Sequence, residues 1–191
     1  MKVAGGCTGS DTLYELSSRA KRGICSSPPN ADLLGAESIM FVNRVRILVE
    51  FGDCDPGDIV FYANYFRWFD QCTSALFHAA GLPLRQLFQS HGVVGIPLVE
   101  ARARFIIPST YGDELVAESS VTEWRKSSFV VSHRFLRDGV LAMEGWETHV
   151  WAAAHPTEAH RMKSVPLPKD VIRKLSATKK RPKIVKVKTD S

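Results

Sequence analysis

The chain is poor in cysteine and has no long apolar run, and each absence excludes a class of protein. Its 191 residues include only four cysteines, which are widely spaced and form no CxxC pair, so neither a disulfide framework nor a cysteine-bound zinc site is expected. No run of about 18 apolar residues is present, so we expect no membrane span. The first six residues lack the apolar core of an export signal. Together these absences predict a protein of the reducing cytoplasm.

Motifs of several enzyme classes are also missing. No GxSxG turn occurs, which disfavours a serine hydrolase built on that turn. The six histidines show no HExxH or comparable ligand spacing, so no metal is expected. A hydratase or dehydratase would need an Asp and a His together for proton transfer, and no histidine lies near the acidic loop described below. These enzyme classes are therefore disfavoured.

Positive charge is present in excess but is concentrated at one end. The net charge is +5, and residues 173–191 carry eight Lys or Arg against one Asp. That segment contributes +7, which leaves −2 for the rest of the chain. A short basic tail of this kind is typical of a solvated end rather than of a nucleic-acid arm. We therefore expect no nucleic-acid partner.

Length and composition predict one globular domain between two extensions. A chain of 191 residues with 45% hydrophobic content is long enough for one core and too short for two domains and a linker. Residues 1–38 mix Gly, Ser, Pro and charge without periodicity, which predicts a poorly ordered extension. Met40, just ahead of the first strand-like segment, is an alternative start. The domain is expected at 41–175 and the basic tail at 176–191.

Apolar periodicity predicts a strand, a long helix and four further strands. Val45, Ile47, Val49 and Phe51 alternate with Arg44, Arg46, Leu48 and Glu50, as in a strand with one buried face. Between Tyr62 and Ala80 apolar residues recur at three- and four-residue steps, followed by Gly81 and Pro83, which predicts a helix of about 18 residues. A period of two returns at 99–105, 114–124, 128–137 and 140–152.

Two local signals complete the expected architecture. Asp138-Gly139 separates the last two strands and predicts a tight antiparallel hairpin. A short helix is expected near 169–175. Because the sheet and the long helix each need the other to cover an apolar face, the sequence predicts an α+β domain: a five-stranded antiparallel sheet wrapped around one long central helix.

The acidic loop between the first strand and the long helix is the candidate site. Asp55 would face the first turn of the helix, whose unpaired N–H groups and positive dipole end suit a developing oxyanion. An Asp ahead of a helix also commonly caps the helix or structures the turn. From the residues alone, both roles for Asp55 stand.

Several motifs resemble one enzyme family. They are EFGDCDP at 50–56, IVFYANY at 59–65, RWFD at 67–70, GLP at 81–83, VGIP at 94–97 and EWRKSSF at 123–129. With these motifs the chain resembles the hot-dog-fold acyl-CoA thioesterases, in particular the 4-hydroxybenzoyl-CoA thioesterase branch. The resemblance covers about residues 41–175. It implies a hot-dog fold and hydrolysis of an acyl-CoA to a free acid and CoA.

The resemblance also implies catalytic roles. Asp55 corresponds to the family's catalytic carboxylate, which attacks the thioester carbon or activates water. Tyr62 corresponds to the residue whose backbone N–H polarises the carbonyl. No metal or other cofactor is implied, because CoA is part of the substrate. The family usually has glycine three residues after the catalytic Asp, where this chain has Asp58, and an Asp tolerates the positive φ that glycine would supply.

Binding residues and assembly follow from the same resemblance. The acyl pocket is expected between the long helix and a partner subunit, with Asp70 accepting a hydrogen bond from a substrate hydroxyl; the other pocket residues would be Phe61, Tyr65, Phe69 and Ile96. The CoA contacts would be Arg125, Lys126, Ser127, Arg161 and Lys163. Core packing for the aromatics and solvated surface charge for the cations are the simpler interpretations. Edge-to-edge pairing of sheets implies a homodimer or homotetramer.

Substrate and class alternatives stay open at this point. A benzoyl, hydroxybenzoyl, aminobenzoyl or short aliphatic acyl group is each chemically reasonable. Cys54, next to Asp55, is an alternative thiol nucleophile. A non-catalytic acyl-CoA-binding regulatory module is the competing class, and loss of the loop carboxylate would have favoured it.

Overall fold

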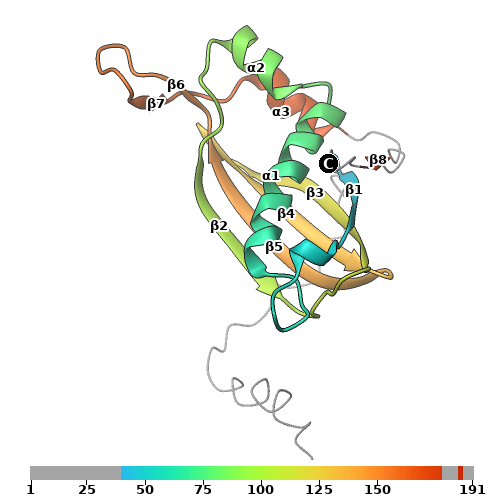
Figure 1. The fold of residues 1–191 in the computed structure, drawn as a ribbon. Coiled ribbons are helices and arrows are strands. Elements are labelled where there is room, and N and C mark those ends of the chain that lie inside the picture. Colours follow the sequence, from blue (N-terminus) through green and yellow to red (C-terminus); the bar gives the residue numbers. More distant parts are fainter. Residues whose placement is uncertain (1–39, 178–184, 187–191) are drawn as a thin grey trace, which may run out of the picture. The chain divides into compact units, whose positions relative to one another are not determined.

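The structure, a computed structural model, describes residues 40–177 and 185–186 (Figure 1). The extension predicted at 1–38 and most of the tail predicted at 176–191 lie outside them.

A single antiparallel sheet of five long strands forms the framework of the domain. In spatial order they are β2 (Leu98–Phe105), β5 (Val140–Val150), β4 (Ser128–Arg137), β3 (Glu114–Trp124) and β1 (Asn43–Leu48). The predicted five-stranded antiparallel sheet is confirmed. A sixth strand that the sequence did not indicate, β8 (Val185–Lys186), pairs in parallel with β1.

The hairpin between β4 and β5 forms where it was predicted. Asp138 and Gly139 both have positive φ, 51° and 79°, as a two-residue hairpin turn requires. The strands on either side pair antiparallel. The Asp-Gly turn therefore sets the pairing of Arg137 with Val140 and of Leu136 with Leu141, beyond which a β-bulge shifts the register by one residue.

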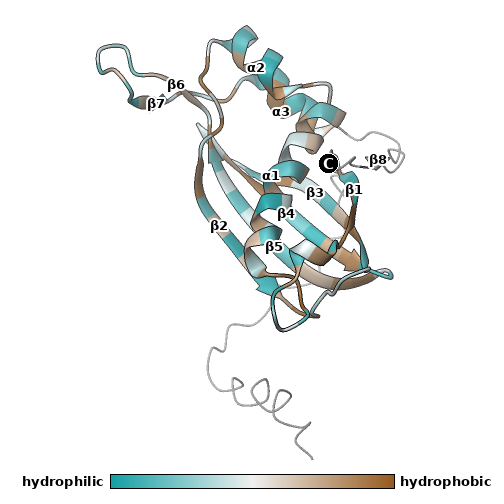
Figure 2. Cartoon of the chain, in the orientation of Figure 1, coloured by the Kyte–Doolittle hydropathy of each residue, from teal (hydrophilic) through white to brown (hydrophobic). Residues whose placement is uncertain are grey.

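Helix α1 (Tyr62–Ala79) covers one face of the sheet, which curves around it (Figure 1). Its buried residues recur at three- and four-residue steps, as an amphipathic helix requires; they are Tyr65, Trp68, Phe69, Cys72, Thr73, Leu76 and Phe77. The strands alternate between hydrophobic and hydrophilic residues (Figure 2), so that one face of the sheet meets the helix. This is the hot-dog arrangement that the resemblance implied.

Helix and sheet are in close contact at Gly145. The ring of Phe69 stacks on His133, with centroids 4.7 Å apart and planes 4° from parallel. A Cβ placed on Gly145 would lie 2.9 Å from Cε1 of Phe69 and closer still to its Cζ. Gly145 pairs with His133 across the sheet, so the missing side chain provides the space that the phenyl ring occupies.

Shorter elements complete the fold. Helix α3 (Lys169–Ser176) lies where a short helix was expected. Three elements were not predicted: the 3-10 turn η2 (Phe51–Asp53), helix α2 (Leu84–His91) and the hairpin of β6 (Ala152–Ala154) and β7 (Met162–Ser164). No helix among the described residues is long and apolar enough to cross a membrane.

The placement of Phe51 corrects one expectation. The sequence predicted Phe51 on the buried face of the first strand, but β1 ends at Leu48 and the chain turns into η2. The Phe51 side chain is 80% exposed. Its ring contacts Tyr111 edge-on at 5.9 Å, because the turn rotates it away from the face that Val45 and Ile47 share.

Candidate active site

Hydrogen bonds of Asp53 connect the acidic loop to the start of α1. Its carboxylate accepts hydrogen bonds from the backbone N–H of Glu50 at 2.9 Å and from Nη2 of Arg67 at 2.8 Å. Its carbonyl oxygen accepts hydrogen bonds from the N–H of Phe61 at 2.8 Å and from Nδ2 of Asn64 at 2.9 Å. The side chain is buried. Asp53 therefore has a structural role in this loop.

Asp55 occupies the turn of a tight loop and has one oxygen free. Cys54 and Val60 form a bridge across the loop, and the N–H of Asp55 donates to the carbonyl of Ile59 at 2.9 Å. Oδ1 of Asp55 accepts a hydrogen bond from the N–H of Gly57 at 2.8 Å. Within the described residues no hydrogen bond reaches Oδ2. The turn thus holds the carboxylate in place and leaves one oxygen for chemistry.

Asp58 takes the conformation that the family leaves to glycine. Its φ is 58°, in the left-handed region that Asp tolerates better than most side chains. Its N–H donates to the carbonyl of Asp55 at 3.0 Å, and its own carbonyl accepts from Oγ1 of Thr110 at 2.7 Å. This is the positive φ that an Asp at this position was expected to tolerate.

Only some of the backbone N–H groups at the start of α1 are hydrogen-bonded. The helix has no side-chain cap and no acidic residue in its first turn. The N–H groups of Phe61 and Asn64 are bonded, to the carbonyls of Asp53 and Phe61. In the described part of the chain no hydrogen bond engages the N–H of Tyr62 or Ala63. Because the dipole of the helix is positive at this end, the turn is suited to bind a developing oxyanion.

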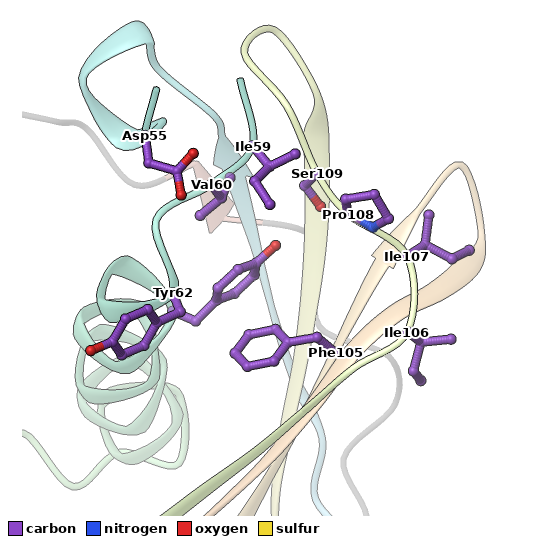
Figure 3. A pocket seen from close by; sticks show the side chains of 10 residues that line it. Asp55, Ile59, Val60, Tyr62, Phe105, Ile106, Ile107, Pro108 and Ser109 are labelled. Atoms are coloured by element: carbon purple, nitrogen blue, oxygen red, sulfur yellow. The ribbon is translucent and has the colours of Figure 1, made fainter. Parts of the chain in front are cut away.

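Asp55 and this helix turn border the same cavity, called here the Asp55 cavity. Its volume is about 430 Å³, and its walls are mainly apolar; the lining residues are Asp55, Ile59, Val60, Tyr62, Tyr65, Phe105, Ile106, Ile107, Pro108 and Ser109. Figure 3 shows Asp55 beyond the start of α1, with Phe105 to Ser109 forming the wall opposite Tyr62. A carboxylate, a helix N-terminus and an apolar wall therefore surround one space.

Three predicted pocket residues take different positions. Tyr65 lines the Asp55 cavity, and burial raises the pKa of its phenol. Phe61 is half exposed and packs edge-on against the ring of Tyr62, with centroids 4.8 Å apart. Phe69 is fully buried in the core, which corrects its assignment to the pocket wall: in this chain it packs against His133 instead of a ligand.

The other two predicted pocket residues, Asp70 and Ile96, border a second cavity. Its volume is about 460 Å³, and we call it the Glu147 cavity; it is lined by Phe66, Asp70, Thr73, Ser74, Leu84, Phe88, Ile96, Pro97, Leu98, Glu147 and His149. The two cavities lie at opposite ends of β2, because one includes Leu98 and the other Phe105. Within one chain, Asp70 therefore does not share a cavity with Asp55.

A buried polar network lies beside the Glu147 cavity. Oε2 of Glu147 contacts Oγ1 of Thr73 at 3.0 Å, Nε2 of His133 at 3.2 Å and Nε2 of His149 at 3.3 Å. Ser119 Oγ lies 2.8 Å from Nδ1 of His133. Burial alone would raise the pKa of Glu147, but the hydrogen bonds from the two histidines outweigh it and lower that pKa to about 2. The group is therefore a buried carboxylate.

This network predicts that acid destabilises the fold. Glu147 stabilises the folded chain above its ordinary pKa of 4.5 and loses that contribution as the pH falls toward 2. Burial lowers the pKa of His133 below 6.5, so below pH 6.5 the unfolded chain binds a proton that the folded chain excludes. Each such proton lowers the stability by up to about 1.4 kcal/mol per pH unit.

We expect the unfolding temperature, measured by circular dichroism, to fall steadily from pH 7 to pH 4. In His133→Gln the slope between pH 6.5 and 5 should be smaller, because one of the titrating groups is gone. A flat profile for the native protein, or an unchanged slope in the variant, would contradict this explanation.

Three predicted CoA contacts, Arg125, Lys126 and Ser127, form the turn between β3 and β4, whereas Arg161 and Lys163 belong to the β6–β7 hairpin. The carbonyl of Lys126 accepts from the N–H of Leu167, which joins this turn to the segment after β7, and the carbonyl of Ser127 accepts from the N–H of Trp151, between β5 and β6. Arg125 is paired with Glu123 at 2.8 Å, and Arg161 is paired with Glu158. Lys126 and Lys163 are exposed and have no ion pair among the described residues.

Two parts of the site were not predicted from the sequence: the residues after β2 and the buried polar network. The wall from Ile106 to Ser109 has no motif of its own. For Glu147 and His149 a signal existed, because a period of two places both on the same face of β5 as Met143 and Gly145, the face that is buried. A polar residue at such a position needs a partner.

In the described part of the chain, no group of three or more His, Cys, Asp or Glu is arranged to hold a metal ion.

Comparison with known families decides the classification. A family model described as the thioesterase-like superfamily matches residues 49–175, which is more than half of the chain. The chain belongs to this superfamily. The thioesterase is 37% identical over 143 residues to the 4-hydroxybenzoyl-CoA thioesterase of Pseudomonas sp. (strain CBS-3), a match that covers 72% of this chain and 96% of that relative.

Solved structures agree with this relationship. The thioesterase matches a variant of 4-hydroxybenzoyl-CoA thioesterase in complex with 4-hydroxybenzoyl-CoA, with a TM-score of 0.65, 35% identity, and coverage of 71% of this chain and 99% of that one. It also matches a gentisyl-coenzyme A thioesterase, with a TM-score of 0.60, 28% identity, and coverage of 71% and 100%. The protein is thus a thioester hydrolase that acts on acyl-CoA.

Proposed function

We propose that this thioesterase hydrolyses an aromatic acyl-CoA, of the benzoyl or hydroxybenzoyl type, with Asp55 as the catalytic carboxylate and the N–H of Tyr62 as the oxyanion donor. The observation that carries the proposal is the Asp55 cavity, where a carboxylate with a free oxygen and an uncapped helix N-terminus border one space. A thioester carbonyl needs both groups, a nucleophile or base on its carbon and a donor on its oxygen.

The chemistry follows from these two groups. Oδ2 of Asp55 either attacks the thioester carbon or removes a proton from the water that attacks it. The carbonyl electrons move onto oxygen, where the N–H of Tyr62 and the helix dipole stabilise the charge. Collapse expels the CoA thiolate, and water supplies the oxygen of the free acid. In this proposal no cofactor takes part, because CoA is itself part of the substrate.

An aromatic acyl group is supported by the relatives and by the cavity walls. The relatives named above act on 4-hydroxybenzoyl-CoA or gentisyl-coenzyme A. Both cavities have aromatic rings in their walls, Tyr62, Tyr65 and Phe105 in one, and Phe66 and Phe88 in the other. A flat ring packs well against such walls. A short aliphatic chain would leave part of this surface without contacts, so it is the second candidate.

The complete site, in our proposal, contains two copies of the chain. Among the described residues β2 pairs only with β5, so its other edge is free, and its side chains Leu98, Val99 and Phe105 are about half exposed. An antiparallel pair of β2 strands from two copies would bring Leu98 of one beside Phe105 of the other. The Asp55 cavity of one copy would then adjoin the Glu147 cavity of the other, as the resemblance to dimeric and tetrameric enzymes suggests.

Release of free thiol from a panel of acyl-CoAs tests the function. Benzoyl-, 4-hydroxybenzoyl-, 4-aminobenzoyl-, acetyl- and hexanoyl-CoA cover the substrates that were considered. We expect the aromatic substrates to have the larger kcat/KM. A preference for hexanoyl-CoA would support the aliphatic alternative. Measurable binding of acyl-CoA without hydrolysis of any substrate would support the non-catalytic binding module.

Lys126 provides a test of the CoA end of the site. We expect Lys126→Ala to raise KM for acyl-CoA by about 3- to 10-fold with little change in kcat, because an exposed cation near a phosphate contributes roughly 1 kcal/mol and does not touch the reacting bond. The effect should shrink at high salt. The matching acyl-N-acetylcysteamine thioester, which lacks the nucleotide, is the control. An equal rise in KM for that substrate would contradict a role in phosphate binding.

A further inference from the structure

The two carboxylate oxygens of Glu147 differ in their hydrogen bonds: Oε2 has three partners, and Oε1 has none among the described residues. Three donors converge on Oε2, from Thr73, His133 and His149, at 3.0 to 3.3 Å. Nδ1 of His149 also faces an acceptor, the carbonyl of Ile96, at 2.9 Å. Both ring nitrogens of His149 therefore lie within hydrogen-bond distance of an acceptor oxygen. Within the described residues no hydrogen bond reaches Oε1.

The network holds the carboxylate rigidly. His133 is stacked on Phe69, and His149 is stacked on Phe129 with centroids 5.5 Å apart. Glu147 itself is 2% exposed. Neither histidine can rotate without breaking a ring contact, so Oε2 stays engaged. The direction of Oε1 is therefore determined by the fold and not by a mobile side chain.

The cavity beside Glu147 presents mostly apolar surface to a ligand. Its walls include Phe66, Leu84, Phe88, Ile96 and Pro97, and about 460 Å³ is ample for an aromatic ring. Asp70 also lines it but lies on the surface of the single chain, so its contact with water depends on the partner copy proposed above. Oε1 belongs to a carboxylate that the fold of one chain already buries, where water does not compete for its hydrogen bonds. A neutral donor on the ligand would form a charge-assisted hydrogen bond with it.

We propose that Oε1 of Glu147 accepts a hydrogen bond from a ring hydroxyl of the acyl group, and that Glu147 rather than Asp70 determines the preference for hydroxylated substrates. This inference rests on the proposed function, since it concerns the acyl group of the same reaction. A site built to bond a hydroxyl discriminates strongly against the analogue that lacks it, because the buried acceptor is then left unpaired. An acyl group that bears a carboxylate on its ring would be repelled.

The test compares preferences rather than single rates. For the native protein we expect kcat/KM for 3- or 4-hydroxybenzoyl-CoA to exceed that for benzoyl-CoA by at least about tenfold. In Glu147→Gln this ratio should fall about tenfold. Glu144→Gln is the matched control, because Glu144 lies on the same strand but faces away from the helix and pairs with Arg104. An unchanged ratio in Glu147→Gln, or a ratio that falls only in Asp70→Asn, would overturn the proposal.

A binding measurement on the native protein tests the role of Glu147 even if the Glu147→Gln variant does not fold. Thioether analogues, in which a CH₂ group separates the carbonyl from sulfur, cannot be hydrolysed. Calorimetry should show that the hydroxyphenyl analogue binds about tenfold more tightly than the phenyl and methoxyphenyl analogues. Equal affinities would overturn the role of Glu147 whether or not hydrolysis occurs. Absence of hydrolysis with this preference intact would instead contradict only the proposed reaction.

Discussion

Asp55→Asn is expected to lower kcat for the preferred acyl-CoA by about 10³-fold. The amide keeps the shape of the side chain and can still accept the hydrogen bond that Gly57 donates to Oδ1 at 2.8 Å. It removes the charge on Oδ2, without which the group neither attacks the thioester carbon nor takes a proton from water. KM should change much less than kcat, because Asp55 acts on the reacting bond. Steady-state release of free thiol measures both constants.

Two variants of neighbouring residues make this experiment specific. Asp58→Asn makes the same change three residues away, at a position with a φ of 58° that Asn also tolerates, and activity should stay within about twofold of native. Cys54→Ala removes the alternative thiol nucleophile and should also remain active. If Cys54→Ala were inactive while Asp55→Asn was not, the nucleophile would be the thiol and our proposal would be wrong.

Gly145→Ala should have the largest effect on stability among single methyl additions. The new Cβ would overlap the tip of the Phe69 ring, with Cε1 at 2.9 Å and Cζ closer. The ring cannot move aside easily, because it is fully buried and stacked on His133. We expect a loss of about 3 kcal/mol in the free energy of unfolding, which lowers the unfolding temperature by roughly 10 °C.

Denaturant titration of four variants, Gly145→Ala, Gly52→Ala, Phe69→Leu and the double variant of Phe69 and Gly145, would test the stated cause. Gly52→Ala is the control, since nothing lies within 4 Å of a Cβ at that position, and its stability should change by less than about 0.5 kcal/mol. Phe69→Leu combined with Gly145→Ala should recover part of the loss, because the shorter side chain vacates the overlap. If the double variant were as unstable as the sum of the two single variants, the overlap would not be the cause.

Much of the fold was predictable because periodicity and burial agree along most of the chain. The helix from Tyr62 and the strands 114–124 and 128–137 were predicted at or within one residue of their bounds. Phe51 was misplaced because a period of two does not show where a strand ends and a 3-10 turn begins. Helix α2 was not predicted. Its eight residues follow Gly81 and Pro83, which were interpreted only as the signal that ends α1.

The sequence predicted the kinds of groups that form the site, but it predicted their relative positions only in part. Asp55 and the start of α1 meet at one cavity, as expected from their adjacency in sequence. The separation of Asp70 from Asp55 could not be foreseen, because it depends on which end of β2 each cavity borders. Glu147 was overlooked for a different reason: its role depends on His133 and Thr73, which are 14 and 74 residues away, and no local motif connects them.

The short strand β8 has a consequence for how far the assembly can grow. A sheet with two open edges can add copies without limit, as filaments do. Here β8 pairs with Val45 and Arg46 and covers that part of the β1 edge. At the opposite edge of the described sheet, no strand pairs with the outer side of β2, which is eight residues long. In the pair of copies that we propose, the β2 strand of the partner would cover this edge, so a further copy would have to join at the partly covered β1 edge or through the faces of the sheets or helices.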